Sequence, residues 1–357
     1  MDDQASSKKS ALTTKVTKVV TLYQPHTWKE KGLWWTLGLF SITYLVIVVV
    51  LGILWSRSPR PLDVTEHALG LVGNDPVKLV TGAVTTATAI GIAETLLDKT
   101  GGYLSNDMTP PGVYLDNIPN WEFGALTELR DLTSAMRNEF SRAQSQSVED
   151  ADLQLAEPKF NFDSESWILP STESEYRGGI EWLKHYLGRL YDDKDFDAQF
   201  FARADNLVAY LEVVGKRLGS LAQRLSYAPG QAQLDTALAG EPSATQSTPV
   251  SNQTMNKTPW LKIDDVFFEA RGYTWALLNS LKAMEVDFAS VLKDKNALVS
   301  MQQIIRELEN TQKMIWSPMI LNGTGFGPMA NHSLVMASYI SRANAAIIDL
   351  RNLLVQG

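Results

Sequence analysis

The sequence predicts an all-α protein, with a single N-terminal transmembrane helix followed by a multi-helix bundle that has long ordered loops. Residues 33–55 form an uncharged apolar run that is long enough to cross a bilayer. Later segments place apolar residues at alternating spacings of three and four, which is the period of antiparallel helix bundles. Convincing period-two alternation, the mark of half-buried strands, is missing throughout.

The apolar run is LWWTLGLFSITYLVIVVVLGILW, which has 23 residues. As a helix it would be about 35 Å long, against a hydrocarbon core of about 30 Å. Trp34 and Trp35 stand at one end and Trp55 at the other, where amphipathic rings prefer the headgroup layer. A cleaved signal peptide would need a shorter apolar run and a small-residue cleavage site. We therefore expect residues 33–55 to bind the lipid bilayer as an anchor.

Charge is distributed unevenly along the chain. Residues 1–60 hold eight Lys/Arg and three acids, which gives +5, so residues 61–357 hold −13 of the net charge of −8. The positive-inside rule then predicts a cytoplasmic basic tail over residues 1–32 and a C-terminal body on the other side of the membrane. An acidic body without a basic stripe argues against a nucleic-acid partner. The absence of cysteine excludes disulfides and thiolate chemistry.

The body is expected to begin with a short stalk, residues 56–65, and to contain two helical parts, residues 66–227 and 260–357. The residues between them, 228–259, contain no aromatic side chain and are rich in Ala, Gln, Ser, Thr and Pro, which predicts a disordered linker. Whether the two parts share one core stays open at this stage. The expected helices cover 76–98, 123–142, the seam from Tyr176 to Leu190, the seam from Phe200 to Leu225, 262–316 with a break near 294–296, and the seam from Met336 to Leu354.

Residues 99–122, KTGGYLSNDMTPPGVYLDNIPNWE, interrupt this helical pattern. Their glycines and prolines stop helices, while their aromatic and aliphatic side chains argue against disorder. We expect an ordered loop that folds back over the end of the bundle and places Trp121 at the mouth of the next helix. A structural plug, a binding site and a catalytic site all remain open. The residues that we predict to bind a partner or ligand are Tyr103, Asn106, Asp107, Tyr114, Asp116 and Trp121.

No recognisable metal-ligand spacing, cofactor motif or catalytic constellation is present in the sequence. The four histidines lie far apart, and no HExxH or GxSxG motif occurs. We therefore predict no metal, no cofactor and no catalytic residue.

Three strings, GGYLSND (101–107), PPGVYLDNIPNWEFG (110–124) and SWILPSTESEYRGG (166–179), resemble the bacterial family called domain of unknown function 2333. The resemblance extends over nearly the whole chain. It implies a Gram-negative inner-membrane protein with a single span and a periplasmic body. It implies no activity, so no catalytic residue carries over.

Together these features favour a membrane-anchored periplasmic interaction or scaffold protein of the cell envelope, with an envelope protein as its partner. One alternative is a periplasmic ligand-binding or sensor bundle that works through a partner. Another is an envelope hydrolase that uses Glu94, Asp107 or Asp116 as general acid or base, since carboxylates are the plausible catalysts in this chain.

Overall fold

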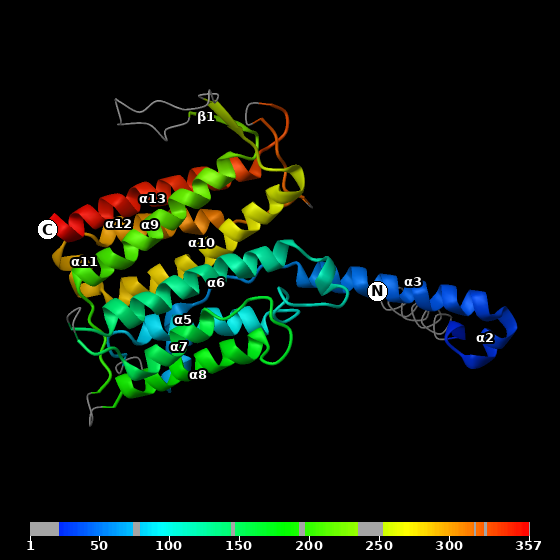
Figure 1. The fold of residues 1–357 in the computed structure, drawn as a ribbon, viewed down its shortest axis with the longest axis horizontal. Coiled ribbons are helices and arrows are strands. Elements are labelled where there is room, and N and C mark those ends of the chain that lie inside the picture. Colours follow the sequence, from blue (N-terminus) through cyan, green and yellow to red (C-terminus); the bar gives the residue numbers. More distant parts are fainter. Residues whose placement is uncertain are drawn as a thin grey trace, which may run out of the picture. The chain divides into compact units, whose positions relative to one another are not determined.

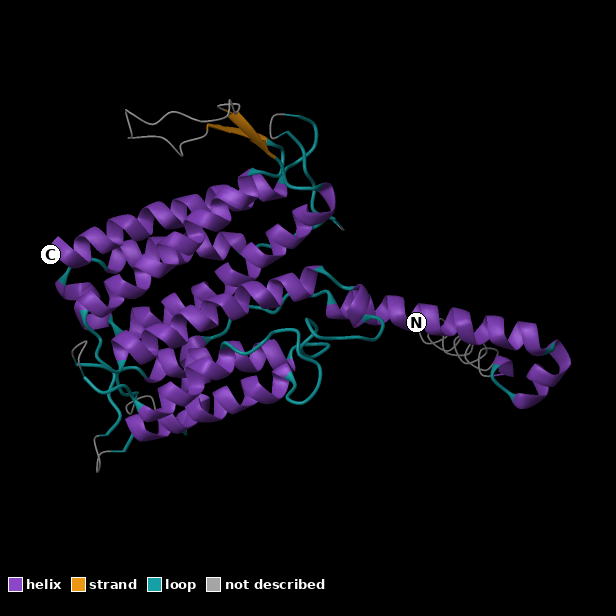
Figure 2. Ribbon diagram, in the orientation of Figure 1, coloured by secondary structure: helices purple, strands orange, loops and turns teal. Residues whose placement is uncertain are grey.

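The computed structural model of the chain describes residues 21–73, 79–143, 147–192, 197–234, 253–317, 319–324 and 327–356. The chain divides into two compact units, residues 1–55 and 56–357. Over the described ranges it forms twelve α-helices and one two-stranded sheet (Figures 1 and 2). The prediction of an all-α fold with one N-terminal apolar helix is confirmed.

The first unit contains α2 (Pro25–Lys31) and α3 (Leu33–Trp55), which are separated by Gly32 at φ 83°. Only glycine adopts this left-handed conformation at low cost, so Gly32 marks the break between the two helices. By length and composition, α3 is able to cross a membrane. Its side chains are largely exposed within its own unit, as expected for a helix whose apolar surface faces lipid.

The second unit, the body, is built from ten helices among its described residues. Short 3₁₀ turns lie at Gly112–Tyr114 (η2) and Trp260–Lys262 (η4), and a π-helical turn, Met136–Phe140 (η3), follows α6. The helices are α4 (Val64–Val72), α5 (Ala83–Asp98), α6 (Asn117–Ala135), α7 (Ala151–Phe160), α8 (Thr172–Leu190), α9 (Ala204–Ser226), α10 (Ile263–Asp287), α11 (Ala289–Asp294), α12 (Leu298–Thr311) and α13 (His332–Gln356).

Helix α10 lies at the centre of the body, where it packs against α5, α6, α9 and α12 (Figure 1). One continuous apolar core includes residues from both sides of the 228–259 segment. In this core the rings of Trp121 on α6 and Trp275 on α10 lie 4.9 Å apart. The two helical parts therefore share a single core, which answers the question that the sequence left open.

Helices α6 and α10 approach closely enough for their backbones to touch. A Cβ atom added at Gly272 would lie 1.9 Å from the Trp121 carbonyl oxygen, and one at Gly124 would lie 2.0 Å from the Glu269 carbonyl oxygen. Any side chain at either position would force the helices apart, so the two glycines set the distance between the two parts of the body.

Helix α5 is buried along most of its length, from Ala83 through Ala93. Its Ala, Gly and Thr residues are small and allow close helix packing. The helix begins at Ala83, after Gly82 at φ 88°, instead of at residue 76. Residues 74–78 lie outside the described residues.

Helix α6 begins six residues earlier than we expected. We predicted that the prolines of residues 99–122 would stop helices, and for Pro119 that prediction is wrong. The Asp116 carboxylate accepts the Asn117 backbone N–H at 2.8 Å, and Pro119 occupies the first helical turn. Backbone N–H groups in the first turn have no intrahelical acceptor, so proline costs little there.

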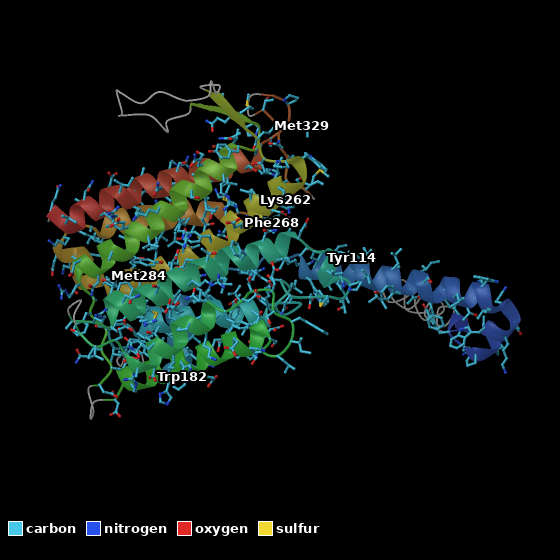
Figure 3. All side chains as sticks on the ribbon, in the orientation of Figure 1. Tyr114, Trp182, Lys262, Phe268, Met284 and Met329 are labelled. Carbon is cyan, nitrogen blue, oxygen red and sulfur yellow. The ribbon has the colours of Figure 1, made fainter. Side chains whose placement is uncertain are left out.

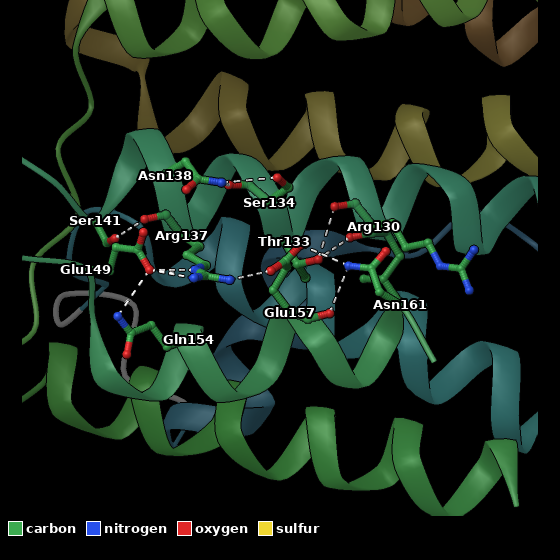
Figure 4. Close-up of polar contacts among 11 residues, drawn as sticks. Arg130, Thr133, Ser134, Arg137, Asn138, Ser141, Glu149, Gln154, Glu157 and Asn161 are labelled. Atoms are coloured by element: carbon green, nitrogen blue, oxygen red, sulfur yellow. Dashed lines mark hydrogen bonds and ion pairs between the residues drawn. The ribbon is translucent and has the colours of Figure 1, made fainter. Parts of the chain in front are cut away.

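The sequence analysis did not predict α7. Polar contacts join this helix and the residues before it to α6 and η3 (Figure 4). The Arg137 guanidinium donates to Glu149 and to Glu157, each at 2.7 Å. The Arg130 side chain donates to the backbone carbonyl oxygen of Phe160 at 2.7 Å, where α7 ends. Helix α7 is short and contains a proline near its C-terminus, so its own sequence pattern is weak.

The region predicted as helical over 262–316, with one break, forms α10, α11 and α12. The expected break near 294–296 is present, and a second break at Phe288 separates α10 from α11. Helix α13 buries Met336, Ile340, Ala343, Ile347, Leu350 and Leu354, the seam that its spacing predicts.

Two ends of the predicted linker are ordered. Strand β1 (Gln231–Leu234) pairs antiparallel with β2 (Gln253–Asn256), with Gln231 opposite Asn256 and Leu234 opposite Gln253. Next to the strands, the Thr258 N–H, which follows β2, donates to the carbonyl oxygen of Tyr227, which precedes β1, at 3.0 Å. This pairing differs from the disorder that we expected for 228–259. Residues 235–252 lie outside the described residues.

Candidate functional site

The loop that follows α5 is organised around the carboxylate of Glu122. This side chain is fully buried, and it pairs with the ammonium group of Lys99, which is also buried. The backbone N–H groups of Leu104 and Ser105 donate to the same carboxylate at 2.9 and 2.8 Å. A buried charge is costly unless it is paired and hydrogen-bonded. Glu122 meets both conditions, and in doing so it fixes the course of residues 99–105.

A second loop, residues 161–171, is bonded to the first. The Tyr103 hydroxyl donates to the Ser164 carbonyl oxygen at 3.0 Å. The Asn106 amide donates to the Ser166 carbonyl oxygen at 2.9 Å and to the Glu173 carboxylate at 3.0 Å. Both side chains are buried, so the polar groups that we predicted to bind a ligand serve as internal bonds between two loops.

Trp121 lies in the second turn of α6 and is fully buried against Trp275. We expected it at the mouth of the helix, and this expectation is wrong because α6 begins earlier than predicted. Its role in the described structure is to join α6 to α10.

Asp107, Tyr114 and Asp116 are partly or fully accessible to solvent, whereas Tyr103, Asn106 and Trp121 are buried. The backbone of Gly112 lies against the Asp107 carboxylate, because a Cβ at Gly112 would lie 2.1 Å from its oxygen. Burial raises the pKa of Asp107 above its ordinary value, and the nearby charges of Glu122 and Glu173 add to this rise. Tyr114 is exposed on η2, and Asp116 is exposed as the cap of α6. The loop thus holds Tyr103, Asn106 and Trp121 inside and leaves Tyr114 and Asp116 outside.

The carboxylates considered as acid–base catalysts do not form an evident constellation. Glu94 pairs with Lys184 of α8 at 3.0 Å, and Asp116 accepts a bond at a helix N-terminus. Within the ranges that the structure describes, no group of three or more His, Asp or Glu side chains is arranged to hold a metal ion.

An apolar pocket that the sequence analysis missed lies between α10, the end of α12 and the start of α13. Its volume is about 450 Å³, and its lining includes Phe267, Trp316, Leu321, His332, Met336 and Tyr339. Arg271 borders it, but its guanidinium donates to the carbonyl oxygens of Thr311, Gln312 and Lys313, each at 3.0 Å. Burial lowers the pKa of Arg271 to about 10. This arginine therefore caps α12, and the pocket offers mainly apolar contacts. The signal in the sequence was the apolar run MIWSPMIL in a segment that follows a helix.

A buried acid that the sequence analysis also missed lies on α6. Glu128 is fully buried and accepts a hydrogen bond from the Tyr210 hydroxyl at 2.6 Å. Burial raises its pKa to about 7, and the hydrogen bond from Tyr210 offsets only part of the rise. The signal was its position, because Glu128 falls on the apolar stripe that also contains Trp121, Ala125 and Leu132.

Comparison with known proteins identifies a bacterial family. A family model described as "Uncharacterized protein conserved in bacteria (DUF2333)" matches residues 28–357. The matched range includes α3, both parts of the body and the loops around Glu122. No curated protein and no solved structure matches the chain.

Proposed function

Because this chain belongs to the bacterial DUF2333 family, whose description states no activity, we propose a function from its own residues: a membrane-anchored interaction protein of the bacterial cell envelope. In this proposal α3 anchors the body in the inner membrane, the basic N-terminal tail is cytoplasmic, and the body is periplasmic. The body acts as a scaffold for an envelope protein partner and performs no chemistry.

The observation that carries this proposal is the closed polar centre around Glu122. A general acid or base must be able to reach a substrate proton, directly or through one water. Glu122 and Lys99 are buried and bonded to each other, and Asn106 and Tyr103 bond to the neighbouring loop. This centre holds two loops in place and leaves the surface of a rigid body for binding.

The charge distribution supports the proposed orientation. Six lysines precede α3, while Arg57 and Arg60 follow it, so the basic excess lies on the N-terminal side. Basic segments next to a span remain in the cytoplasm.

Site-directed photocrosslinking in cells tests the scaffold role. A photoreactive phenylalanine analogue would replace exposed residues on three helices: Leu155 on α7, Val213 on α9 and Ile348 on α13. If the body is a scaffold, probes on the face that binds the partner should all crosslink to the same protein. Probes on the other faces should give no crosslinked product. A complete scan of the exposed positions without any adduct would contradict the proposal. Unirradiated cells provide the control.

A second candidate function is ligand binding, which the apolar pocket favours. Its volume of about 450 Å³ lies in the range of small-molecule sites. The chain should then bind an apolar fluorescent probe, and Met336→Trp, which fills the pocket, should weaken binding about tenfold or more. Equal binding by Met336→Trp and by Val299→Trp, an exposed control on α12, would refute this candidate.

A further inference from the structure

One end of the body, which we call the tether end, is where the chain enters it. The tether end comprises residues 56–60 and the described residues of the connections 99–116, 161–171, 227–262 and 312–331. Helices α5, α7, α9 and α12 end there, and α6, α8, α10 and α13 begin there. Figure 1 shows these connections gathered at one end of the body, and Figure 3 labels Tyr114, Lys262 and Met329 toward it, with Met284 toward the other end.

Hydrogen bonds hold these connections together. The Asn322 amide donates to the Ala228 carbonyl oxygen at 3.0 Å, and the Thr258 N–H donates to the Tyr227 carbonyl oxygen at 3.0 Å. The first two loops are joined through Tyr103 and Asn106, as described above. These bonds join the connections in two pairs, residues 99–116 with 161–171 and residues 227–262 with 312–331.

Large apolar side chains are exposed across this surface. Three body tryptophans in the described ranges are more than a third exposed, and all of them lie here: Trp167, Trp260 at 72% and Trp316 at 91%. Their exposed neighbours are Tyr114, Ile168, Leu169, Leu261, Met314 and Met319. The connections at the opposite end, 73–82, 141–150, 191–203 and 288–297, expose Val148 but no aromatic side chain among their described residues.

The chain itself indicates what covers this surface. Residue 56 directly follows Trp55, the last residue of α3, and Arg57 and Arg60 already line a hollow on the body beside Glu94 and Asp98 of α5. Leu62 then donates its N–H to the Asn279 side chain at 2.9 Å. A fully extended chain advances about 3.5 Å per residue, so the tether end cannot move far from the point where α3 leaves a bilayer.

The chemistry of the exposed side chains fits the surface of a bilayer. Tryptophan and tyrosine prefer the headgroup layer, and leucine, isoleucine and methionine insert just below it. The charged residues of this end have both signs: Arg57 and Arg60 lie beside Glu94 and Asp98, and Lys262 lies near Asp116 and Asp264. Such a surface does not require anionic lipid, because apolar burial supplies the attraction.

We propose that the tether end is a lipid-binding face, which rests on the same bilayer that α3 crosses and uses Trp167, Trp260 and Trp316 as interfacial anchors. This contact fixes the orientation of the body relative to the membrane. It goes beyond the scaffold role and does not depend on any protein partner, so it can fail while the scaffold role stands.

The absence of cysteine allows a direct test with single-cysteine variants of the full chain in nanodiscs. Ile168→Cys and Leu261→Cys report on the tether end, and Val148→Cys and Val299→Cys, which are also exposed, report on the opposite end. Each variant carries an environment-sensitive fluorophore, and spin-labelled lipid serves as the quencher. We expect at least about threefold stronger quenching at residues 168 and 261 than at 148 and 299, in phosphatidylcholine discs and equally in discs with added phosphatidylglycerol.

Replacement of Trp167, Trp260 and Trp316 together by alanine should reduce this quenching to the level of the control positions and leave helicity unchanged, because all three are exposed. Equal quenching at both ends, or quenching that requires phosphatidylglycerol, would overturn the proposal. Probes at residues 168 and 261 that are shielded from water but not quenched by lipid would also overturn it, since a protein would then cover this face.

Discussion

Replacement of Glu128 by glutamine should make the body more stable at neutral and higher pH. Glu128 is fully buried, and the Tyr210 hydroxyl donates to it at 2.6 Å. Glutamine keeps the size of the side chain and an acceptor oxygen for Tyr210, but it cannot ionise. The substitution therefore removes the cost of a buried negative charge and retains most of the packing.

The magnitude follows from the pKa of Glu128, which burial raises from 4.5 to about 7. Between these two values the folded protein holds a proton that the unfolded chain has released, so stability falls as pH rises through this window. Each tenfold change in proton affinity corresponds to about 1.4 kcal/mol, which gives a loss of about 3 kcal/mol above pH 7. The variant escapes this loss. The difference in unfolding free energy between the variant and the wild type should therefore increase by about 3 kcal/mol from pH 4.5 to pH 8.

Thermal unfolding of the full chain in a mild detergent, followed by circular dichroism at pH 5 and pH 8, measures this difference. For a body of this size, about 3 kcal/mol corresponds to a melting-temperature difference of about 5 °C. Glu181→Gln, at an exposed position on α8, is the matched control and should show no difference at either pH. A Glu128→Gln effect that is the same at both pH values would refute the reasoning, because it would mean that Glu128 does not titrate in this window.

Three further predictions concern the fold and its orientation. Gly272→Ala should destabilise the body by about 1–3 kcal/mol or more because its Cβ would meet the α6 backbone, whereas Gly188→Ala, in open space on α8, should not lower the melting temperature. Joining Leu234 to Gln253 through an Asn-Gly turn should leave helicity and melting temperature nearly unchanged, since these residues are paired; a fall of ten degrees or more would contradict this. A phosphatase reporter fused after Gly357 should be active in cells, and activity of a cytoplasm-only reporter at the same site would reverse the proposed topology.

The helical architecture could be predicted because its signals are local. The seam of α13 from Met336 to Leu354 and the small residues of α5 specify the buried faces of these helices without knowledge of their neighbours. The start of α6 was misjudged because proline and asparagine stop helices in most positions but are tolerated in a first turn. The hydrogen bond that the Asp116 carboxylate accepts from the Asn117 N–H marks this segment as the first turn of a helix.

The candidate site could be predicted only in outline. The apolar content of residues 99–122 correctly indicated an ordered loop, but not which of its polar residues would be used internally. The partners of Tyr103 and Asn106 lie about sixty residues away, at Ser164 and Ser166, and such pairings depend on tertiary structure. The pocket at Trp316 and the lipid-facing surface also depend on how distant loops meet at one end of the body.

Complementation of a strain that lacks the gene tests the central claim, that this protein acts by binding and not by catalysis. The variant combines Glu94→Gln, Asp107→Asn and Asp116→Asn, which keep the shape of each side chain and, at Asp116, the helix cap, but remove every acid–base function considered for this chain. We predict that it restores the wild-type phenotype at wild-type protein levels. Loss of complementation by a folded, normally abundant variant would contradict the account.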